Sequence, residues 1–264
     1  MKIINFMQED KFLHTQPPAN PSERKRMKLQ DRVILITGAS QGLGAEAARA
    51  CAEAGATVVL VGRHQKKLEK VYDTIVSAGC PEPFAVVFDL MAAEEQEYER
   101  LAKAVAEATG GRLNGIIHSA AYFYALSPLE FQTVAEWVNQ YRINTVAPMA
   151  LTRACLPMLQ AASDASVAFI GESHGETPQA YWGGFGASKA ALNYLCKVAA
   201  DEWARFPNLR ANVLVPGPIN SPQRMKTHPG ESRSERRELS ELAPEFVYWM
   251  SEESKGRSGE IVYL

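Results

Sequence analysis

Short runs of consecutive apolar residues alternate along the chain with longer amphipathic segments. The apolar runs predict buried strands, at residues 33–37, 57–62, 84–90, 114–120, 166–171 and 210–217. The segments between them show helical periodicity, at residues 42–55, 64–79, 93–108, 133–160 and 184–205. Strands that are apolar throughout are typical of a parallel sheet covered by helices on both faces. The pattern therefore predicts an α/β fold with one doubly wound parallel sheet of about seven strands.

Two segments fall outside this alternation. Residues 1–30 are mixed, charged and Pro-containing, so we expect a flexible N-terminal extension before a single domain at residues 31–264. Translation could naturally start at Met27, in which case the extension is an upstream extension of the reading frame. The alternative is that the extension is a regulatory or partner-binding arm. Residues 221–240 are polar and follow a strand, so they are expected to form a mobile loop that carries substrate contacts or is merely solvated.

Charge and cysteine usage narrow the class of protein. A formal net charge of -2 gives no reason to expect nucleic acid or an anionic membrane as partner, and no apolar run approaches the length of a membrane helix. The four cysteines are scattered, which favours a reducing cytoplasm over a disulfide framework. No His, Cys or Asp cluster has the spacing of metal ligands, so we expect no metal and a small-molecule ligand.

A glycine-rich turn, TGASQGLG at residues 37–44, joins the first strand to the first helix. Its glycines would let the backbone approach a pyrophosphate, and the helix N-terminus supplies free N–H groups. The spacing departs from G-x-G-x-x-G, and any tight turn can use glycine. The residues predicted to contact a nucleotide here are Gly38, Ser40, Gln41, Gly42, Leu43 and Gly44.

Two positions at strand ends bear on which nucleotide is bound. Arg63 stands where a diol-binding carboxylate is common in NAD-binding proteins, so it favours NADP, with NAD as the alternative. Arg63 could instead belong to a solvated basic helix start with Lys66 and Lys67. Asp89 is placed to accept a hydrogen bond from an adenine, or it could simply cap the next element.

Taken together, these motifs resemble those of the short-chain dehydrogenase/reductase family, over nearly everything from Asp31 to the C-terminus. Five segments match family motifs in the order in which the family has them: TGASQGLG, FDL, RINTVAPMALT, FGASK and VPGPINS. The resemblance implies a Rossmann-type NAD(P)-binding domain. It adds cofactor contacts, at Leu90, Ser119, Ala120, Ala121, Lys189, Pro216, Gly217, Ile219 and Ser221.

The resemblance implies hydride transfer between nicotinamide and a small carbonyl or alcohol, but the catalytic positions match only in part. Asn144 and Lys189 match the active-site asparagine and lysine, whereas Phe185 stands where the family has its proton-donating tyrosine. The serine position falls on Glu172, with Ser173 beside it. Asn144, Glu172, Ser173, Phe185 and Lys189 are therefore the candidate catalytic residues.

Two hypotheses remain open at this point. The first is an oxidoreductase with weak or rearranged catalysis, in which Glu172 or His174 replaces the phenol. His118 is more easily read as structural, and Tyr181 could replace the lost hydroxyl if a loop brings it close to that position. The second is an inactive dinucleotide-binding scaffold or redox sensor. The resemblance also implies a homodimer or homotetramer through the long helices, for which Leu192, Leu195, Val198 and Ala199 are available unless they pack within the chain.

Overall fold

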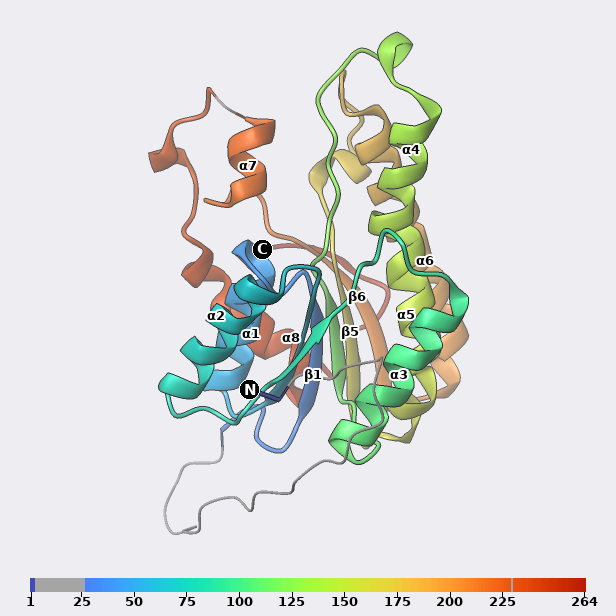
Figure 1. Ribbon diagram of the computed structural model, residues 1–264. Helices are drawn as coiled ribbons and strands as arrows, with labels where there is room; N and C mark the ends of the chain where they lie inside the picture. The colour runs from blue at the N-terminus through green and yellow to red at the C-terminus, as the bar shows by residue number, and fades with distance from the viewer. Residues whose placement is uncertain (3–26, 229) are drawn as a thin grey trace.

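The computed structural model describes residues 1–2, 27–228 and 230–264. Its centre is one seven-stranded parallel sheet in the order β3-β2-β1-β4-β5-β6-β7 (Figure 1). The strands are β1 (Val33–Thr37), β2 (Thr57–Gly62), β3 (Phe84–Val87), β4 (Gly115–His118), β5 (Ala165–Ile170), β6 (Leu209–Val215) and β7 (Ile261–Tyr263). Every residue of β1, β4, β5 and β6 is buried, as expected for strands covered on both faces. The predicted doubly wound α/β fold is confirmed.

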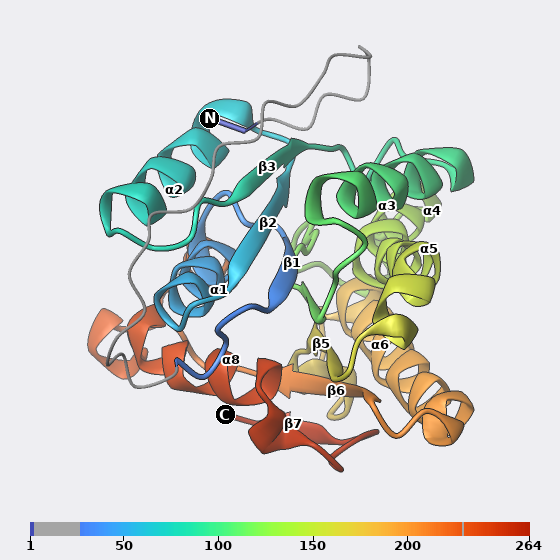
Figure 2. The ribbon, with the colours of Figure 1, turned by 90° about the horizontal axis from the view of Figure 1, so that it is seen from below.

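Helices cover the sheet in two layers, which Figure 2 shows on opposite sides of the strands. One layer contains α1 (Gly42–Glu53), α2 (Gln65–Ser77) and α8 (Ala243–Met250). The other contains α3 (Glu95–Thr109), α5 (Ala147–Ala161) and α6 (Gly183–Glu202), with α4 (Val134–Tyr141) leading into α5. Each layer packs against its own face of the sheet, so the core consists of two apolar clusters.

The long helix predicted at residues 133–160 is helical but not uniform. A π-helical turn, Arg142–Val146, separates α4 from α5. Pro148 is the second residue of α5, directly after the π-helical turn, and Pro157 lies inside α5. A single π turn adds one residue to an otherwise α-helical stretch, which is too small a change for hydrophobic periodicity to reveal.

Three further segments differ from the prediction. The expected loop at residues 221–240 contains a short helix, α7 (Pro222–Thr227), which the Ser221 side chain caps. The strand expected to continue to residue 90 ends at Val87, and β7 and α8 had not been expected. The packed domain begins before residue 31, the expected boundary, because the Leu29 side chain is fully buried and its N–H donates to the Ala54 carbonyl.

The described ends of the predicted extension both contact the domain. Lys2 lies against the outer edge of β3, where its carbonyl accepts a hydrogen bond from the Ala85 N–H. Its own N–H donates to the Tyr72 hydroxyl, and its ammonium pairs with Glu82 at 2.9 Å. The flexibility predicted for the extension concerns mainly residues 3–26, which lie outside the described residues.

A buried ionic cluster joins the N-terminal ends of β1, β5 and β6. The Asp164 carboxylate, 1% exposed, accepts hydrogen bonds from Arg32 at 2.7 Å and from Arg210 at 2.6 and 3.1 Å. Arg210 also donates to the Ser251 carbonyl and the Ser254 hydroxyl. Burial alone would raise the pKa of Asp164, but hydrogen bonds and charges of Arg210 and Arg32 outweigh it and lower that pKa.

Candidate active site

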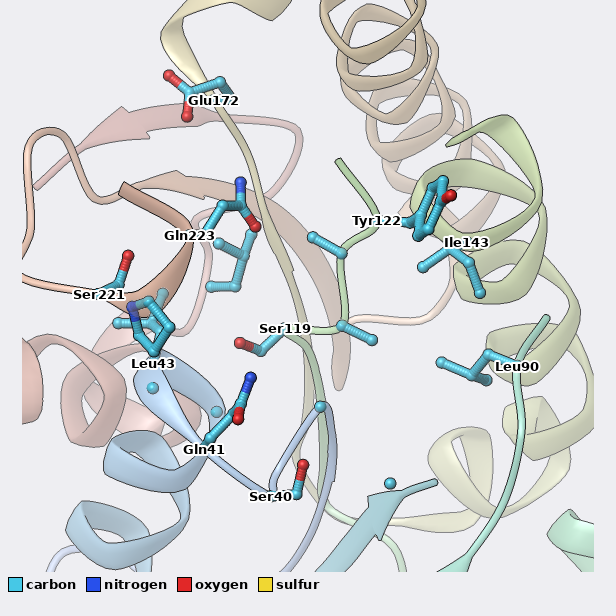
Figure 3. Close-up of a pocket in the computed structure, with 18 of the residues that line it drawn as sticks. Ser40, Gln41, Leu43, Leu90, Ser119, Tyr122, Ile143, Glu172, Ser221 and Gln223 are labelled. Atoms are coloured by element: carbon cyan, nitrogen blue, oxygen red, sulfur yellow. The ribbon is translucent and has the colours of Figure 1, made fainter. Parts of the chain in front are cut away.

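A pocket of about 290 Å³ opens at the carboxyl ends of the strands. It lies around β1 and β4, the two strands between which the chain reverses its direction across the sheet. Ligands of open α/β sheets bind at such a reversal. Figure 3 shows Gln41 and Ser119 facing each other across the pocket, with Leu90 and Ile143 on one side and Ser221 on the other.

The glycine-rich turn leaves a compact cradle at the start of α1. A side chain at Gly44 would place its Cβ 2.4 Å from the Gly38 carbonyl, and one at Gly38 would lie 2.8 Å from the Ala120 N–H. Gly38 and Gly42 also have positive φ, of 68° and 57°. No side chain caps α1, and its first turn has no acidic residue, so its first N–H groups remain available to an anion. The cradle fits a pyrophosphate.

A cationic corner lies beside this cradle, at the end of β2. Arg63 is exposed and makes no hydrogen bond or ion pair with any other described residue. Ser40 lies next to the end of β2, since a Cβ on Gly62 would approach the Ser40 Cβ to 3.5 Å. His64 also lines this corner. An unpaired guanidinium with a hydroxyl and an imidazole nearby suits a phosphate monoester.

Asp89 lines the pocket wall between β3 and α3. One carboxylate oxygen accepts a hydrogen bond from the Met91 N–H at 2.9 Å, so Asp89 does stabilise the following turn, as the alternative interpretation proposed. The side chain is exposed, and its second oxygen has no partner among the described residues, so it can also accept a bond from a ligand.

Asn144 does not line the pocket, contrary to its predicted catalytic place. Its side chain is 1% exposed and lies in the π-helical turn, facing the loop after β4. The amide oxygen accepts from the Tyr122 N–H at 2.8 Å, while the amide nitrogen donates to the Tyr122 carbonyl and the Ser188 hydroxyl, both at 2.9 Å. Asn144 therefore fixes the backbone of Tyr122, whose side chain lines the pocket.

Glu172 lines the pocket, but Ser173 does not. The Ser173 side chain turns back and donates to Glu172 Oε1 at 2.9 Å, and the Ser173 N–H donates to the same oxygen at 3.0 Å. His174 Nδ1 lies 3.2 Å from this oxygen. The His174 ring stacks on Trp182, with centroids 3.7 Å apart, and its Nε2 lies 2.7 Å from Gln179. Ser173 therefore acts on Glu172 rather than on a ligand.

Phe185 and Lys189 lie one helical turn apart on α6, and both line the pocket. The Phe185 ring packs edge-on against Phe123 and beside Trp182, with centroid separations of 5.4 and 5.9 Å. The Lys189 ammonium lies 5.7 Å from the Phe185 ring centroid and donates to the Ile170 carbonyl at 2.7 Å. Burial lowers the pKa of Lys189 to about 8, although the charge of Glu172 acts in the opposite direction.

The two other residues weighed as proton donors lie elsewhere. His118 is buried, stacks on Phe169 at 5.2 Å, and has its Nε2 2.8 Å from the Thr152 hydroxyl. Burial lowers the pKa of His118 to about 3, so the ring is neutral and structural. Tyr181 is 56% exposed and does not line the pocket.

The segment around α7 forms the outer wall of the pocket. The guanidinium of Arg224 binds both oxygens of Glu231, at 2.7 and 2.6 Å, and Arg236 binds Glu231 at 2.9 Å. The hydrogen bond and charge of Arg224, reinforced by Arg236, lower the pKa of Glu231 to about 2. The His228 ring of this wall contacts Trp182, with ring centroids 5.5 Å apart. We call these ion pairs the Arg224–Glu231–Arg236 clamp.

The structure brings every predicted cofactor-contact residue to this one pocket. Further lining residues had not been predicted: Gly62, His64, Phe88, Met91, Tyr122, Ile143, Ile170, Gly171, Pro222, Gln223, Arg224 and Thr227. Most of them are direct neighbours of predicted positions. The α7 residues carried a readable signal, because Ser221 followed by Pro222 is a typical helix start.

No helix in the described ranges is long and apolar enough to cross a membrane. Within the same residues, no group of three or more His, Cys, Asp or Glu side chains could hold a metal ion.

Comparison with known proteins agrees with the fold and the pocket. The short chain dehydrogenase family model matches residues 32–232. The oxidoreductase YciK of Escherichia coli K12 is 32% identical over 247 residues, 94% of each chain. A short chain dehydrogenase structure from Pseudomonas syringae is 36% identical, with a TM-score of 0.87 over 93% of this chain and 99% of that one. A short chain dehydrogenase structure from Escherichia coli CFT073, complexed with NADPH, is 32% identical, with a TM-score of 0.87. That comparison covers 91% of this chain and 99% of the other. The chain belongs to the short-chain dehydrogenase family.

Proposed function

We propose that this oxidoreductase uses NADP(H) to transfer hydride to or from a small carbonyl or alcohol carbon. The observation that carries the proposal is that one pocket joins a complete pyrophosphate cradle to a buried lysine at its far end. NADPH in the related structure from Escherichia coli CFT073 supports the choice of cofactor. The Phe185 ring lines the far end of the pocket, where Phe123 and Trp182 pack against it, and it favours an aromatic or otherwise apolar substrate.

Each part of the pocket has a role in this proposal. The free N–H groups of α1 bind the pyrophosphate, and Arg63, Ser40 and His64 bind the 2′-phosphate. Asp89 accepts a hydrogen bond from the adenine, and Lys189 donates to the nicotinamide ribose. The bound dinucleotide supplies the hydride and the chain supplies orientation. Because Phe185 has no hydroxyl, turnover is expected to be slow.

The test is a titration of the purified protein with NADPH and NADH, followed by nicotinamide absorbance with a panel of aromatic aldehydes and ketones. The proposal expects tight NADPH binding and slow oxidation. Binding with no turnover on any carbonyl would favour the alternative function, a dinucleotide-binding scaffold or redox sensor. Absence of binding to either nucleotide would exclude both.

The preference for NADPH should depend on Arg63. Arg63→Ala is expected to weaken NADPH binding by about 10-fold to 100-fold, the value of one or two charge-assisted hydrogen bonds to the 2′-phosphate, and to leave NADH binding nearly unchanged. Fluorescence titration measures both constants. Lys66→Ala is the matched control, since Lys66 is an exposed cation nearby that does not line the pocket. Equal weakening for both nucleotides would contradict the assigned role.

We also propose that the protein forms a dimer or tetramer through the outer faces of α5 and α6. Leu192 and Ala199 are buried within the chain and Leu195 is partly buried against the same core, whereas Val198 and Tyr194 are exposed on α6. Tyr194 is 72% exposed, and Met149 is exposed on α5. Tyr194→Glu should therefore shift the mass measured by light scattering towards the monomer, because it introduces an unpaired charge. Lys255→Glu, at an exposed site beyond α8, is the control.

A further inference from the structure

Phe185 creates a chemical requirement at the far end of the pocket. Reduction of a carbonyl needs a proton on oxygen as hydride reaches carbon, and a phenyl ring has none to give. The titratable side chains that line this end are Glu172, Lys189 and Tyr122. The donor should be one of these, since it must reach the substrate.

Glu172 is arranged as a hydrogen-bond acceptor. Its Oε1 receives the Ser173 N–H and the Ser173 hydroxyl, and it faces His174 Nδ1. All three contacts are made with Oε1, so this oxygen serves as an acceptor. His174 does not line the pocket, because its ring lies flat on Trp182 and its nitrogens point to Glu172 and Gln179.

Lys189 has the opposite arrangement. Its side chain is 3% exposed, yet it lines the pocket next to the Phe185 ring. The ammonium donates one N–H to the Ile170 carbonyl, and the protonated form has two more to donate. It forms no ion pair with any other described residue.

The surroundings of Lys189 keep its proton mobile. From the loop after β5, the charge of Glu172 acts on Lys189. His174 Nδ1 lies next to the Glu172 carboxylate. From the π-helical turn, the uncharged Asn144 and Thr145 reach α6 at Ser188. Burial lowers the pKa of the ammonium to about 8, so it is protonated at neutral pH and gives up its proton more readily than an exposed lysine.

We propose that Lys189 is the proton donor of this site, a catalytic role beyond binding the ribose; this inference rests on the proposed oxidoreductase function. With NADPH bound, the carbonyl carbon would accept its hydride, the C=O π electrons would move to oxygen, and that oxygen would take a proton from Lys189 Nζ. The products are the alcohol, NADP⁺ and a neutral Lys189 amine, which takes a proton back from water. In alcohol oxidation the same amine accepts the proton.

The test measures both Lys189 and the reaction. Titration of ¹³C-labelled lysine by NMR should find one side chain with a pKa near 8 that Lys189→Arg removes. With 4-nitrobenzaldehyde and saturating NADPH, kcat should fall about tenfold per pH unit above this pKa. In Lys189→Arg that pH dependence should disappear and kcat should drop about 100-fold, because a guanidinium keeps its proton, while NADPH affinity stays within a few-fold.

Glu172→Gln separates a donor from a merely structural lysine. Because the charge of Glu172 raises the pKa of Lys189, its removal should move both the NMR transition and the fall in kcat to lower pH together. Lys197→Arg, an exposed position on α6, should change neither.

Three outcomes would overturn the inference. The fall in kcat could persist in Lys189→Arg, it could disappear instead in Tyr122→Phe, or it could stay in place in Glu172→Gln while the NMR transition moves. Each of these leaves NADPH binding and hydride transfer in the parent protein intact. Loss of the proposed function would look different, since the parent would then fail to bind NADPH at all.

Discussion

Replacing Phe185 with tyrosine is expected to raise kcat for carbonyl reduction about 100-fold. The ring already lies beside Lys189 and lines the pocket, so the added hydroxyl meets the substrate end of the cavity. The nearby ammonium would lower the pKa of the new phenol, which makes it a better acid. The gain is put at the lower end of what a positioned acid contributes because Lys189 already supplies a proton. Stopped-flow absorbance of NADPH in single turnovers measures it.

Phe123→Tyr is the matched control for this gain. It adds the same hydroxyl to the ring that packs edge-on against Phe185, at a position that does not line the pocket. It should leave kcat within a few-fold of the parent value. If Phe185→Tyr left the single-turnover rate unchanged while binding NADPH normally, a missing phenol would not be what limits this site.

Asp164→Ala is expected to destabilise the fold by about 3–5 kcal/mol. The substitution leaves Arg32 and Arg210, 7% and 3% exposed, without the carboxylate that neutralises them. Asp164→Asn should cost less, since the amide oxygen can still accept one hydrogen bond. Urea unfolding followed by circular dichroism gives the free energy of unfolding.

Two comparisons test the cause of this loss. Glu107→Ala removes an exposed helix-surface partner of Lys103 and should change stability little. Because the folded-state pKa of Asp164 is lowered, its contribution is present above the unfolded-state value of about 3.9 and is lost as pH falls through the folded-state pKa. The difference between parent and Asp164→Ala should therefore shrink in acid. A difference that stayed constant down to the acid transition would contradict an ionic cause.

The parts of the fold that the sequence predicted are those governed by a repeated pattern. The six predicted strands and the main helices follow from runs of buried apolar residues, and their covered faces follow from the absence of alternation. β7 has only three residues and α7 only six, too few to establish a period. The π-helical turn at Arg142–Val146 depends on which carbonyl each N–H reaches, which side-chain polarity does not encode.

The residues of the candidate site also differ in how well the sequence predicts them. The residues that line the pocket were predictable because backbone geometry brings them together: glycines at a turn and residues at strand ends share one edge of a parallel sheet. Asn144 and Ser173 do not line the pocket, because a side chain on the expected element can still turn away from the cavity. Asn144 binds the Tyr122 backbone, and Ser173 binds Glu172. Rotamers chosen by nearby partners are not visible in spacing.

The Arg224–Glu231–Arg236 clamp has a consequence for how a long dinucleotide enters. All its bonds lie within one stretch of chain, so displacing that stretch outward breaks none of them. Beyond the clamp, the stretch is held by the ring contact of His228 with Trp182, by the buried Thr227, and by a bridge in which the Arg237 N–H donates to the Pro218 carbonyl and the Asn220 N–H donates to the Arg237 carbonyl. A displacement of this stretch as one unit would therefore have to break these contacts, while the clamp itself would stay intact.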